Sequence, residues 1–257
     1  MLERALSVAK EAALKASEVI MDIYNTDFEV DYKEDDSPVT QADREADEII
    51  RQHLKASFPD YALLSEESID DLSRLDASYC WIIDPVDGTK DFVDKTGEFT
   101  INIALSFNGE IVLGVVYVPV KKEMYYAVKG KGSYHEFNHN RTINHVSYRT
   151  EKLRILSSKH HKSEAFLSMI EAAAPKINQV LGVGSSLKGC LIAKGSAEAY
   201  FRFGLTSEWD TGAVQIIVEE AGGIFRQMDH SVMMYNREDT LNRKGFYIVN
   251  KIENVLV

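Results

Sequence analysis

An apolar run in the first half of the chain ends abruptly in polar residues that could do chemistry. The run is Tyr79–Ile83, and Asp84-Pro85-Val86-Asp87-Gly88-Thr89 follows it directly. Its length is that of a buried strand, which would carry both acids to the rim of a sheet. Two carboxylates on one turn repel each other unless a cation or a hydrogen-bond donor neutralises them. The simplest cation is a hard, oxygen-binding ion such as Mg²⁺. The alternative is a turn in which these residues only shape the backbone.

Two further acids, Glu66 and Asp210, also stand where a predicted element begins or ends. Glu66 follows a short apolar strand, and Asp210 lies in the first turn of a helix, where an acid complements the helix dipole. Taken singly, each acid has an ordinary structural explanation. Together with Asp84 and Asp87 they would form a cage for two or three Mg²⁺ ions, with Asp84 as the natural bridging ligand. Two such ions about 4 Å apart stabilise both the attacking and the leaving oxygen of an in-line phosphoryl displacement.

A different class of phosphatase also uses an Asp-Gly-Thr turn after a strand. In haloacid-dehalogenase-like enzymes the nucleophile is an aspartate two residues before the Asp of that turn. Here that position is Pro85, and Asp84 is one residue out of register. A phospho-aspartate mechanism is therefore disfavoured, and a metal-activated water is the expected nucleophile.

Charge and composition exclude several classes of partner. The net charge of −11, from 29 basic and 40 acidic residues, argues against binding long nucleic acid, which needs a basic surface. A small anionic substrate remains compatible, because a site's own metal and basic groups set the local field. No stretch approaches the ~18 apolar residues of a membrane span. Cys80 and Cys190 lie in apolar contexts without CxxC spacing, as expected of buried thiols in a reducing cytoplasm.

The elements that must position the acids can be predicted from periodicity. Residues 2–24 and 40–58 have apolar side chains at helical spacing, and Thr40-x-x-Asp43 forms a capping box at the start of the second helix. Residues 99–107 alternate as in a half-buried strand, and Asn108-Gly109 marks a hairpin turn. Further strands near 111–118 and 124–128 complete an antiparallel meander.

Strands and helices alternate in the second half of the chain. This pattern predicts an α/β (α+β) sandwich with two sheets between helix layers, organised as two closely packed halves, 1–150 and 151–257. The predicted elements of the second half are strands near 154–157, 180–183, 199–203 and 246–249, and helices near 163–174, 185–194 and 207–221.

Four motifs together resemble the inositol monophosphatase superfamily of Mg²⁺-dependent, lithium-sensitive phosphatases. The resemblance implies an αβαβα layered fold. It also implies a metal-binding set of Glu66, Asp84, the carbonyl of Val86, Asp87 and Asp210. Thr89, oriented by Asp43, would help to activate the water, so the capping role of Asp43 competes with a catalytic one. The motifs are Asp35-Asp36-Ser37-Pro38-Val39-Thr40-x-x-Asp43, Leu64-Ser65-Glu66-Glu67, Trp81–Thr89 and Glu208-Trp209-Asp210-Thr211-Gly212-Ala213.

Within the superfamily, the chain is similar to the 3′(2′),5′-bisphosphate nucleotidase branch. That branch has a Gly-Thr-Lys-acid-Phe pattern, as in Gly88–Phe92, where the inositol branch usually has Gly-Thr-x-Asn-Phe. Two departures are Gly189, where relatives commonly carry an aromatic residue, and the segment Thr206-Ser207-Glu208. The other branch motifs are Gly97-Glu98-Phe99-Thr100, Gly184-Ser185-Ser186-Leu187-Lys188 and Ser157-Ser158-Lys159-His160.

A bisphosphate substrate makes a demand that an inositol monophosphate does not. After one phosphate of 3′-phosphoadenosine 5′-phosphate is cleaved, the second must be held by the protein. Ser185, Lys188, helix N-terminal amides and Arg202 could supply that anion site, although ordinary solvated charge is the simpler explanation for both basic residues. The complete expected substrate-binding set is Asp87, Gly88, Thr89, His160, Ser185, Lys188, Arg202 and Asp210.

The sequence thus predicts a Mg²⁺-dependent phosphomonoesterase that removes the 3′-phosphate of 3′-phosphoadenosine 5′-phosphate, with its phosphosulfate form as a further substrate. The alternatives are an inositol monophosphatase or broad sugar-phosphate phosphatase, and a non-catalytic nucleotide-binding protein. A cytoplasmic monomer or homodimer is expected, with peripheral attachment to the inner membrane left open. His135, His139 and His145 lie at no metal-ligand spacing with Cys or Asp, which favours a solvated loop over a soft-metal site.

Overall fold

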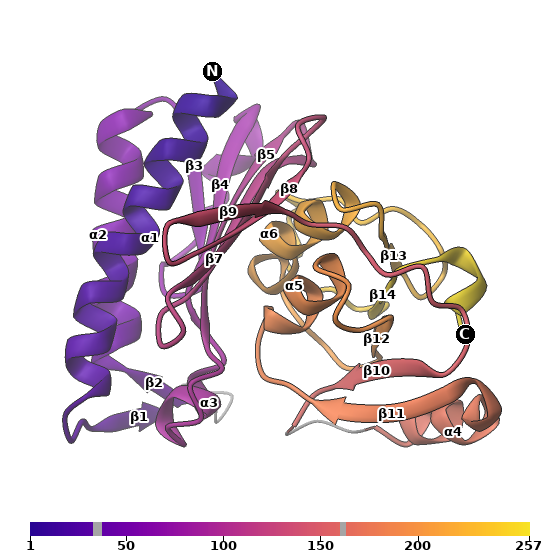
Figure 1. The fold of residues 1–257 in the computed structure, drawn as a ribbon. Helices are drawn as coiled ribbons and strands as arrows, with labels where there is room; N and C mark the ends of the chain where they lie inside the picture. Colours follow the sequence, from indigo (N-terminus) through magenta and orange to yellow (C-terminus); the bar gives the residue numbers. More distant parts are fainter. Residues whose placement is uncertain (33–37, 160–162) are drawn as a thin grey trace.

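Two long helices form the first layer of the molecule (Figure 1). The structure is a computed structural model that describes residues 1–32, 38–159 and 163–257. Helices α1 (Leu2–Tyr24) and α2 (Gln41–Ser57) begin and end close to the predicted residues. The predicted capping box is confirmed, since Asp43 accepts a hydrogen bond from the amide of Thr40 at 2.8 Å. A short antiparallel ribbon of β1 (Val30–Tyr32) and β2 (Pro38–Thr40), which the sequence pattern did not predict, joins the two helices.

A seven-stranded sheet packs against these helices. Its order is β3-β4-β5-β6-β7-β8-β9, with β3 parallel to β4 and all other pairs antiparallel, so the predicted meander is confirmed. Asn108 and Gly109 have φ of 49° and 84°, as a tight hairpin turn of the predicted kind requires. The strands are β3 (Ala62–Ser65), β4 (Tyr79–Asp87), β5 (Thr100–Phe107), β6 (Glu110–Val118), β7 (Glu123–Val128), β8 (Ser133–Phe137) and β9 (Asn140–Ile143).

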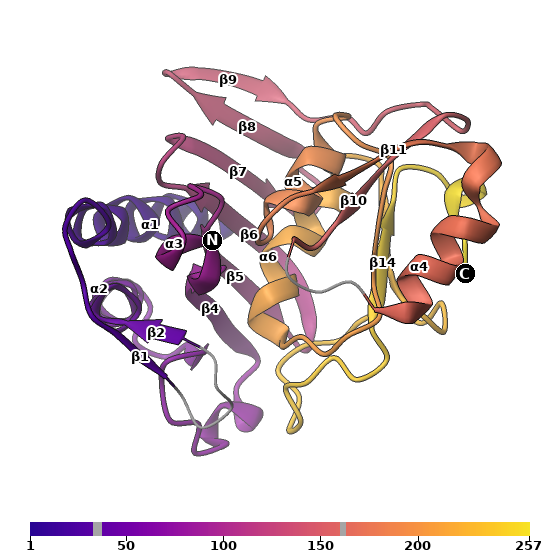
Figure 2. The ribbon, with the colours of Figure 1, turned by 90° about the horizontal axis from the view of Figure 1, so that it is seen from below.

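A five-stranded sheet and its helices make up the rest of the molecule. Its order is β11-β10-β12-β14-β13, and Figure 2 shows α5 and α6 between the two sheets, with α4 on the outer face. The layers are therefore α1/α2, sheet, α5/α6, sheet and α4, which confirms the αβαβα fold; the division at residue 150 stays a prediction. The elements are β10 (Leu153–Ser157), α4 (Glu164–Ala172), β11 (Ile177–Gly182), α5 (Leu187–Ala193), β12 (Ala199–Arg202), α6 (Glu208–Glu219), β13 (Ile224–Gln227) and β14 (Phe246–Val249).

The prediction that residues 99–107 form a half-buried strand was wrong, because both faces of β5 are buried. Ile103 and Leu105 pack into the apolar cluster under α1 and α2. On the opposite face, Ala104 packs into the cluster around α6, and Asn102 and Ser106 are also buried. Alternating polarity predicts a solvated face, but here a helix layer covers the polar side.

Strand β4 also differs from the prediction that it ends at Ile83. It continues to Asp87, and its register against β5 shifts between Asp84, opposite Asn102, and Asp87, opposite Thr100. Three residues of β4 thus span two of β5, which is a bulge. A bulge bends the strand and changes where its side chains point, so both acids can lie on one side of the sheet end.

Helix α6 lies unusually close to the large sheet at Gly114 on β6. A Cβ atom added at Gly114 would lie 2.4 Å from the carbonyl oxygen of Ala213 and 2.8 Å from Cγ2 of Ile216. This approach fixes α6, and thus the start of the helix, against the ends of β4 and β5.

Among the described helices, none is long and apolar enough to cross a bilayer. Cys80 and Cys190 are buried free thiols, as predicted.

Replacing this glycine should test how tightly α6 is held. Gly114→Ala should lower the free energy of unfolding by about 1–3 kcal/mol, because the helix backbone must move to admit the methyl group. Urea denaturation measures the change. The matched control is Gly182→Ala on β11, where the nearest atom to an added Cβ is 3.4 Å away on a flexible lysine. A control within about 0.5 kcal/mol of wild type is expected, and equal losses in both variants would contradict the close-approach argument.

Candidate active site

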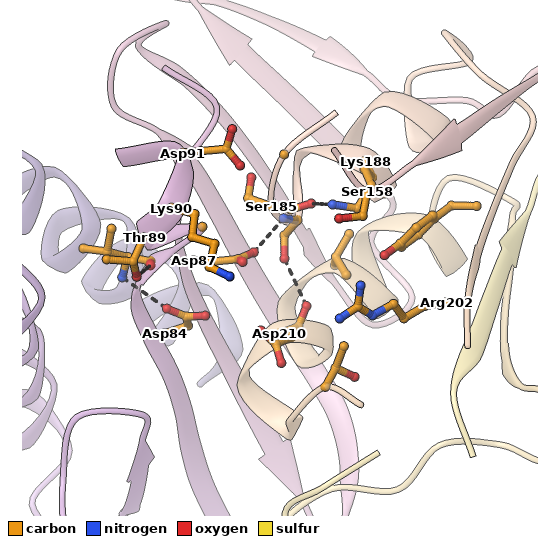
Figure 3. A pocket seen from close by; sticks show the side chains of 18 of the residues that line it. Asp84, Asp87, Thr89, Lys90, Asp91, Ser158, Ser185, Lys188, Arg202 and Asp210 are labelled. Atoms are coloured by element: carbon orange, nitrogen blue, oxygen red, sulfur yellow. Dashed lines mark hydrogen bonds between the residues drawn. The ribbon is translucent and has the colours of Figure 1, made fainter. Parts of the chain in front are cut away.

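A cavity of about 420 Å³ lies between the end of the large sheet and helices α5 and α6 (Figure 3). Asp43 is not part of its wall, and His160 and the segment Asp35-Asp36-Ser37 lie outside the described residues. The chain thus brings together side chains from both of its halves. The predicted site residues that line the cavity are Glu66, Asp84, Val86, Asp87, Gly88, Thr89, Ser185, Lys188, Arg202 and Asp210.

Three of the predicted acids meet at one point of this cavity. Asp84, Asp87 and Asp210 each place a carboxylate oxygen within 4.8 Å of the others. Asp84 is only 1% exposed, and its Oδ1 accepts a hydrogen bond from the amide of Val86 at 3.1 Å. Its Oδ2 is buried without a hydrogen-bond partner among the described residues. Burial, followed by the charges of Glu66 and Asp87, raises the pKa of Asp84 well above its ordinary value.

The other two acids are held by backbone and side-chain donors. The amide of Ser186 (2.6 Å), the Asn102 side chain (3.1 Å) and the Thr100 hydroxyl (3.3 Å) all donate to Oδ2 of Asp87. Asp210 caps α6 by accepting from the amide of Ser207 at 2.5 Å. Burial and the charge of Asp87 raise the pKa of Asp210. Both carboxylates are thus fixed in orientation while their charges remain mutually repulsive.

This arrangement fits a hard divalent cation. The converging groups are all carboxylates, which Mg²⁺ and similar ions prefer over nitrogen or sulfur donors. The unpartnered buried oxygen of Asp84 needs a positive partner, because an isolated buried charge is costly. A bound cation would reverse the effect of burial and repulsion on these pKa values.

Asp43 makes hydrogen bonds on both sides, to the start of α2 and to the turn after β4. Its Oδ2 caps α2 through Thr40, as described above, while its Oδ1 accepts a hydrogen bond from the hydroxyl of Thr89 at 3.3 Å. The Thr89 hydroxyl also lies 3.2 Å from the carbonyl oxygen of Val86. A single buried carboxylate therefore joins the start of α2 to the turn after β4.

Two cationic side chains, Lys188 and Arg202, lie on the side of the cavity away from Asp84, whereas Lys90 lies near Thr89 (Figure 3). Lys188 is 7% exposed, donates to the carbonyl oxygens of Ser185 (2.6 Å) and Val183 (3.3 Å), and lies 5.1 Å from the ring centre of Tyr200. Burial lowers the pKa of Lys188 to about 8. Arg202 donates to the carbonyl oxygen of Leu205, and its Nε is buried without a partner among the described residues.

Several residues that shape the site were not predicted to do so. Asn102 and Ser186 hold Asp87. In the sequence, Asn102 is only one polar residue of an alternating strand, and Ser186 is only the second serine of Ser185-Ser186. Tyr200 supplies the ring under Lys188. Lys159 bridges Glu98 (2.8 Å) and Asp91 (3.3 Å), joining the end of β10 to the segment after β4. These roles depend on contacts between distant segments, which residue type and spacing do not reveal.

The structure also bears on two further residues discussed from the sequence, Gly189 and His135. A Cβ atom at Gly189 would lie 2.1 Å from Cγ2 of Val214, so α5 and α6 pack too closely here for an aromatic side chain. The prediction of a solvated loop is wrong for His135, which lies on β8, stacks on Tyr125 and forms a hydrogen bond with Glu123 at 3.2 Å, whereas His139 and His145 are exposed and lie outside the strands. The partners of His135 are an aromatic ring and one acid, so a packing role accounts for it.

Comparisons with known proteins agree with this site. The profile of the inositol monophosphatase family matches residues 1–255. The 3′(2′),5′-bisphosphate nucleotidase CysQ of Salmonella typhimurium (strain LT2) is 37% identical over 251 residues, or 96% of this chain and 99% of that protein. The crystal structure of CysQ from Bacteroides thetaiotaomicron superposes with a TM-score of 0.84 at 35% identity, covering 96% and 98% of the two chains.

An IMPase from Thermotoga maritima has a similar fold but a more distant sequence. Its TM-score is 0.82 at 26% identity, covering 97% of this chain and 92% of that one. The matches extend over nearly the whole length of each protein, and the acids that meet in the cavity come from the motifs that carried the resemblance. The chain belongs to the inositol monophosphatase family.

Proposed function

We propose that the chain is a 3′(2′),5′-bisphosphate nucleotidase, a metal-dependent phosphomonoesterase that converts 3′-phosphoadenosine 5′-phosphate to 5′-AMP and phosphate. The observation that carries this proposal is a single cavity with three carboxylates at one side and Lys188 and Arg202 at the other. One side suits a cation-bound reacting phosphate, and the other suits a second anion. The relatives named for this activity support the same substrate class.

The metal-binding set in this proposal is Glu66, Asp84, the carbonyl of Val86, Asp87 and Asp210, holding two to three Mg²⁺ ions. When bound, the ions would polarise the phosphate and make water a stronger nucleophile. Asp84, with its buried unpartnered oxygen, is the proposed shared ligand. The described hydrogen bonds to Asp87 and Asp210 keep their carboxylates aimed at this position before the substrate arrives.

Thr89 and Asp43 orient the attacking water in this proposal. The Thr89 hydroxyl lies within hydrogen-bond distance of Asp43 Oδ1 and of the Val86 carbonyl, and in this proposal it donates its proton to Asp43, which leaves its oxygen lone pairs to accept a hydrogen bond from water. Glu66 lies at the same end of the cavity and is the proposed acid–base partner in proton movement. The carboxylate of Asp43 thereby acts through Thr89 and not by direct contact with the phosphate.

The second phosphate would be held by Ser185, Lys188 and Arg202, with Gly88 letting the backbone approach the substrate. A phosphosulfate at the 5′ position carries a similar anionic group, so that substrate is compatible with the same residues. An inositol phosphate would leave these donors without an anion. The part of His160, a monomeric or homodimeric state and a cytoplasmic location stay predictions.

A comparison of substrates tests the proposal directly. With Mg²⁺, phosphate release from 3′-phosphoadenosine 5′-phosphate should exceed that from inositol 1-phosphate by at least about tenfold in kcat/KM, because a charged hydrogen bond contributes about 1.5–3 kcal/mol. Lithium should suppress both reactions. A preference for inositol 1-phosphate would reject the nucleotidase assignment, and absence of any Mg²⁺-dependent release would reject catalysis.

Asp84→Asn tests the metal cage with two opposite readouts. Turnover should fall by more than about 100-fold, because a ligand is lost. In EDTA at pH 7.5 or above, however, the melting temperature should rise, by about 2–4 °C per kcal/mol of relieved repulsion. The sign follows from the raised pKa, since a buried acid that resists ionisation destabilises the fold once it is charged. Calorimetry with and without Mg²⁺ measures this, and exposed Asp94→Asn is the control. Retained Mg²⁺ stabilisation in Asp84→Asn would refute the cage.

Lys188→Met keeps the apolar stem and removes the charge. It should raise KM for the bisphosphate about 10- to 100-fold while changing KM for a monophosphate little.

In the wild type, KM for the bisphosphate should rise as pH increases through about 8, because burial favours the neutral amine and only the ammonium binds an anion. Lys188→Met should lose this dependence. The control is Lys194→Ala, just after the end of α5, where the lysine bonds to the hydroxyl of Tyr125. Equal KM changes for both substrates would contradict the assignment.

A further inference from the structure

Helix α2 carries a second buried acid one turn after Asp43. Asp47 is 4% exposed and Asp43 is 2% exposed. Residues four apart share one face of a helix, so both acids face inward beside Ala46 and Ile50. Helix packing alone would be served by an apolar residue, which avoids the desolvation cost of a buried carboxylate. The reaction described above has no use for Asp47, so its burial calls for another explanation.

The contacts of Asp47 enclose one short turn. Its Oδ1 accepts a hydrogen bond from the hydroxyl of Ser65 at 2.5 Å, and its Oδ2 accepts one from the hydroxyl of Ser68 at 2.9 Å. The guanidinium of Arg51 lies 3.2 Å from Oδ2 and balances the charge. Ser65 and Ser68 are the residues on either side of Glu66-Glu67. Both ends of that turn are therefore fastened to the two oxygens of one carboxylate.

The fastened turn carries a proposed metal ligand. The amide of Glu66 donates to the carbonyl oxygen of Ile83 at 3.2 Å, so its backbone is tied to β4 just before Asp84. Its side chain lines the cavity. The backbone of Glu66 is therefore held from both sides, at a position from which its charge acts on Asp84.

We propose that Asp47 is a positioning residue that holds Glu66 in the geometry needed for metal binding. The proposal rests on the assignment of Glu66 as a metal ligand in the proposed function. Asp43 and Asp47 would then act in parallel from one helix. Asp43 orients Thr89 after β4, and Asp47 orients Glu66 after β3. Residues that orient metal ligands typically change metal affinity by 10- to 100-fold when they are lost.

Direct Mg²⁺ binding provides the test. Asp47→Ala should weaken Mg²⁺ binding by about 10-fold or more in isothermal titration calorimetry without substrate, and raise the Mg²⁺ concentration for half-maximal rate by a similar factor. KM for the bisphosphate at saturating Mg²⁺ should change little. Glu48→Ala, an exposed neighbour on the same helix, is the matched control. A merely structural role would lower the melting temperature of Asp47→Ala without changing Mg²⁺ affinity, and that result would overturn the proposal.

Two further sets of variants guard against misfolding and separate the causes. Asp47→Asn keeps the volume, and the double variant Ser65→Ala/Ser68→Ala removes the same hydrogen bonds while leaving Asp47 in place; both should weaken Mg²⁺ binding. In a Glu66→Gln background, Asp47→Ala should cause no additional loss. If Mg²⁺ binding weakens in Glu66→Gln but is unchanged in Asp47→Ala, the positioning role is overturned and the ligand set stays intact. Unchanged binding in both overturns the ligand assignment of Glu66, and the positioning role with it.

Discussion

The mutual repulsion of buried carboxylates is the constraint on which the rest of this structure depends. Asp84, Asp87 and Asp210 meet within 4.8 Å, and burial together with the neighbouring acids raises the pKa of Asp84 and of Asp210. Such a cluster requires a fold that determines the position of each acid, and its charge is balanced either by protons or by a bound cation. The donors to Asp87 and the cap of α6 by Asp210 meet the first requirement. The all-oxygen donor set is suited to the second.

The sandwich is built so that two distant parts of the chain supply this cluster. Strand β4 delivers Asp84 and Asp87 through a bulge, and α6 delivers Asp210 from more than a hundred residues later. The close approach of α6 to Gly114 brings the helix near the sheet. Helices cover both faces of the large sheet, so Asp84 is buried at the strand end, where electrostatic interactions are stronger than in water.

Helix α2 is a scaffold for the site as well as a packing element. Its first turn uses Asp43 both to cap the helix and to hold Thr89, so folding of the helix and orientation of the hydroxyl are linked. One turn later, the serines that flank Glu66 bond to the same helix. A rigid helix positions polar groups better than a loop does. The turns after β3 and β4, which lie at the cavity, are both hydrogen-bonded to α2.

The sequence by itself determined most of the elements and which acids meet in the cavity. The capping box, the hairpin at Asn108-Gly109 and the acids at strand ends follow from local rules, since each depends on residues a few positions apart. Only the tertiary structure decided that the alternating strand is buried on both faces, that β4 continues through a bulge, and that Asn102 and Ser186 hold Asp87. These features arise where α6 and the loop before α5 meet the sheet. Contacts between segments so distant along the chain leave no periodic or spacing signal in it.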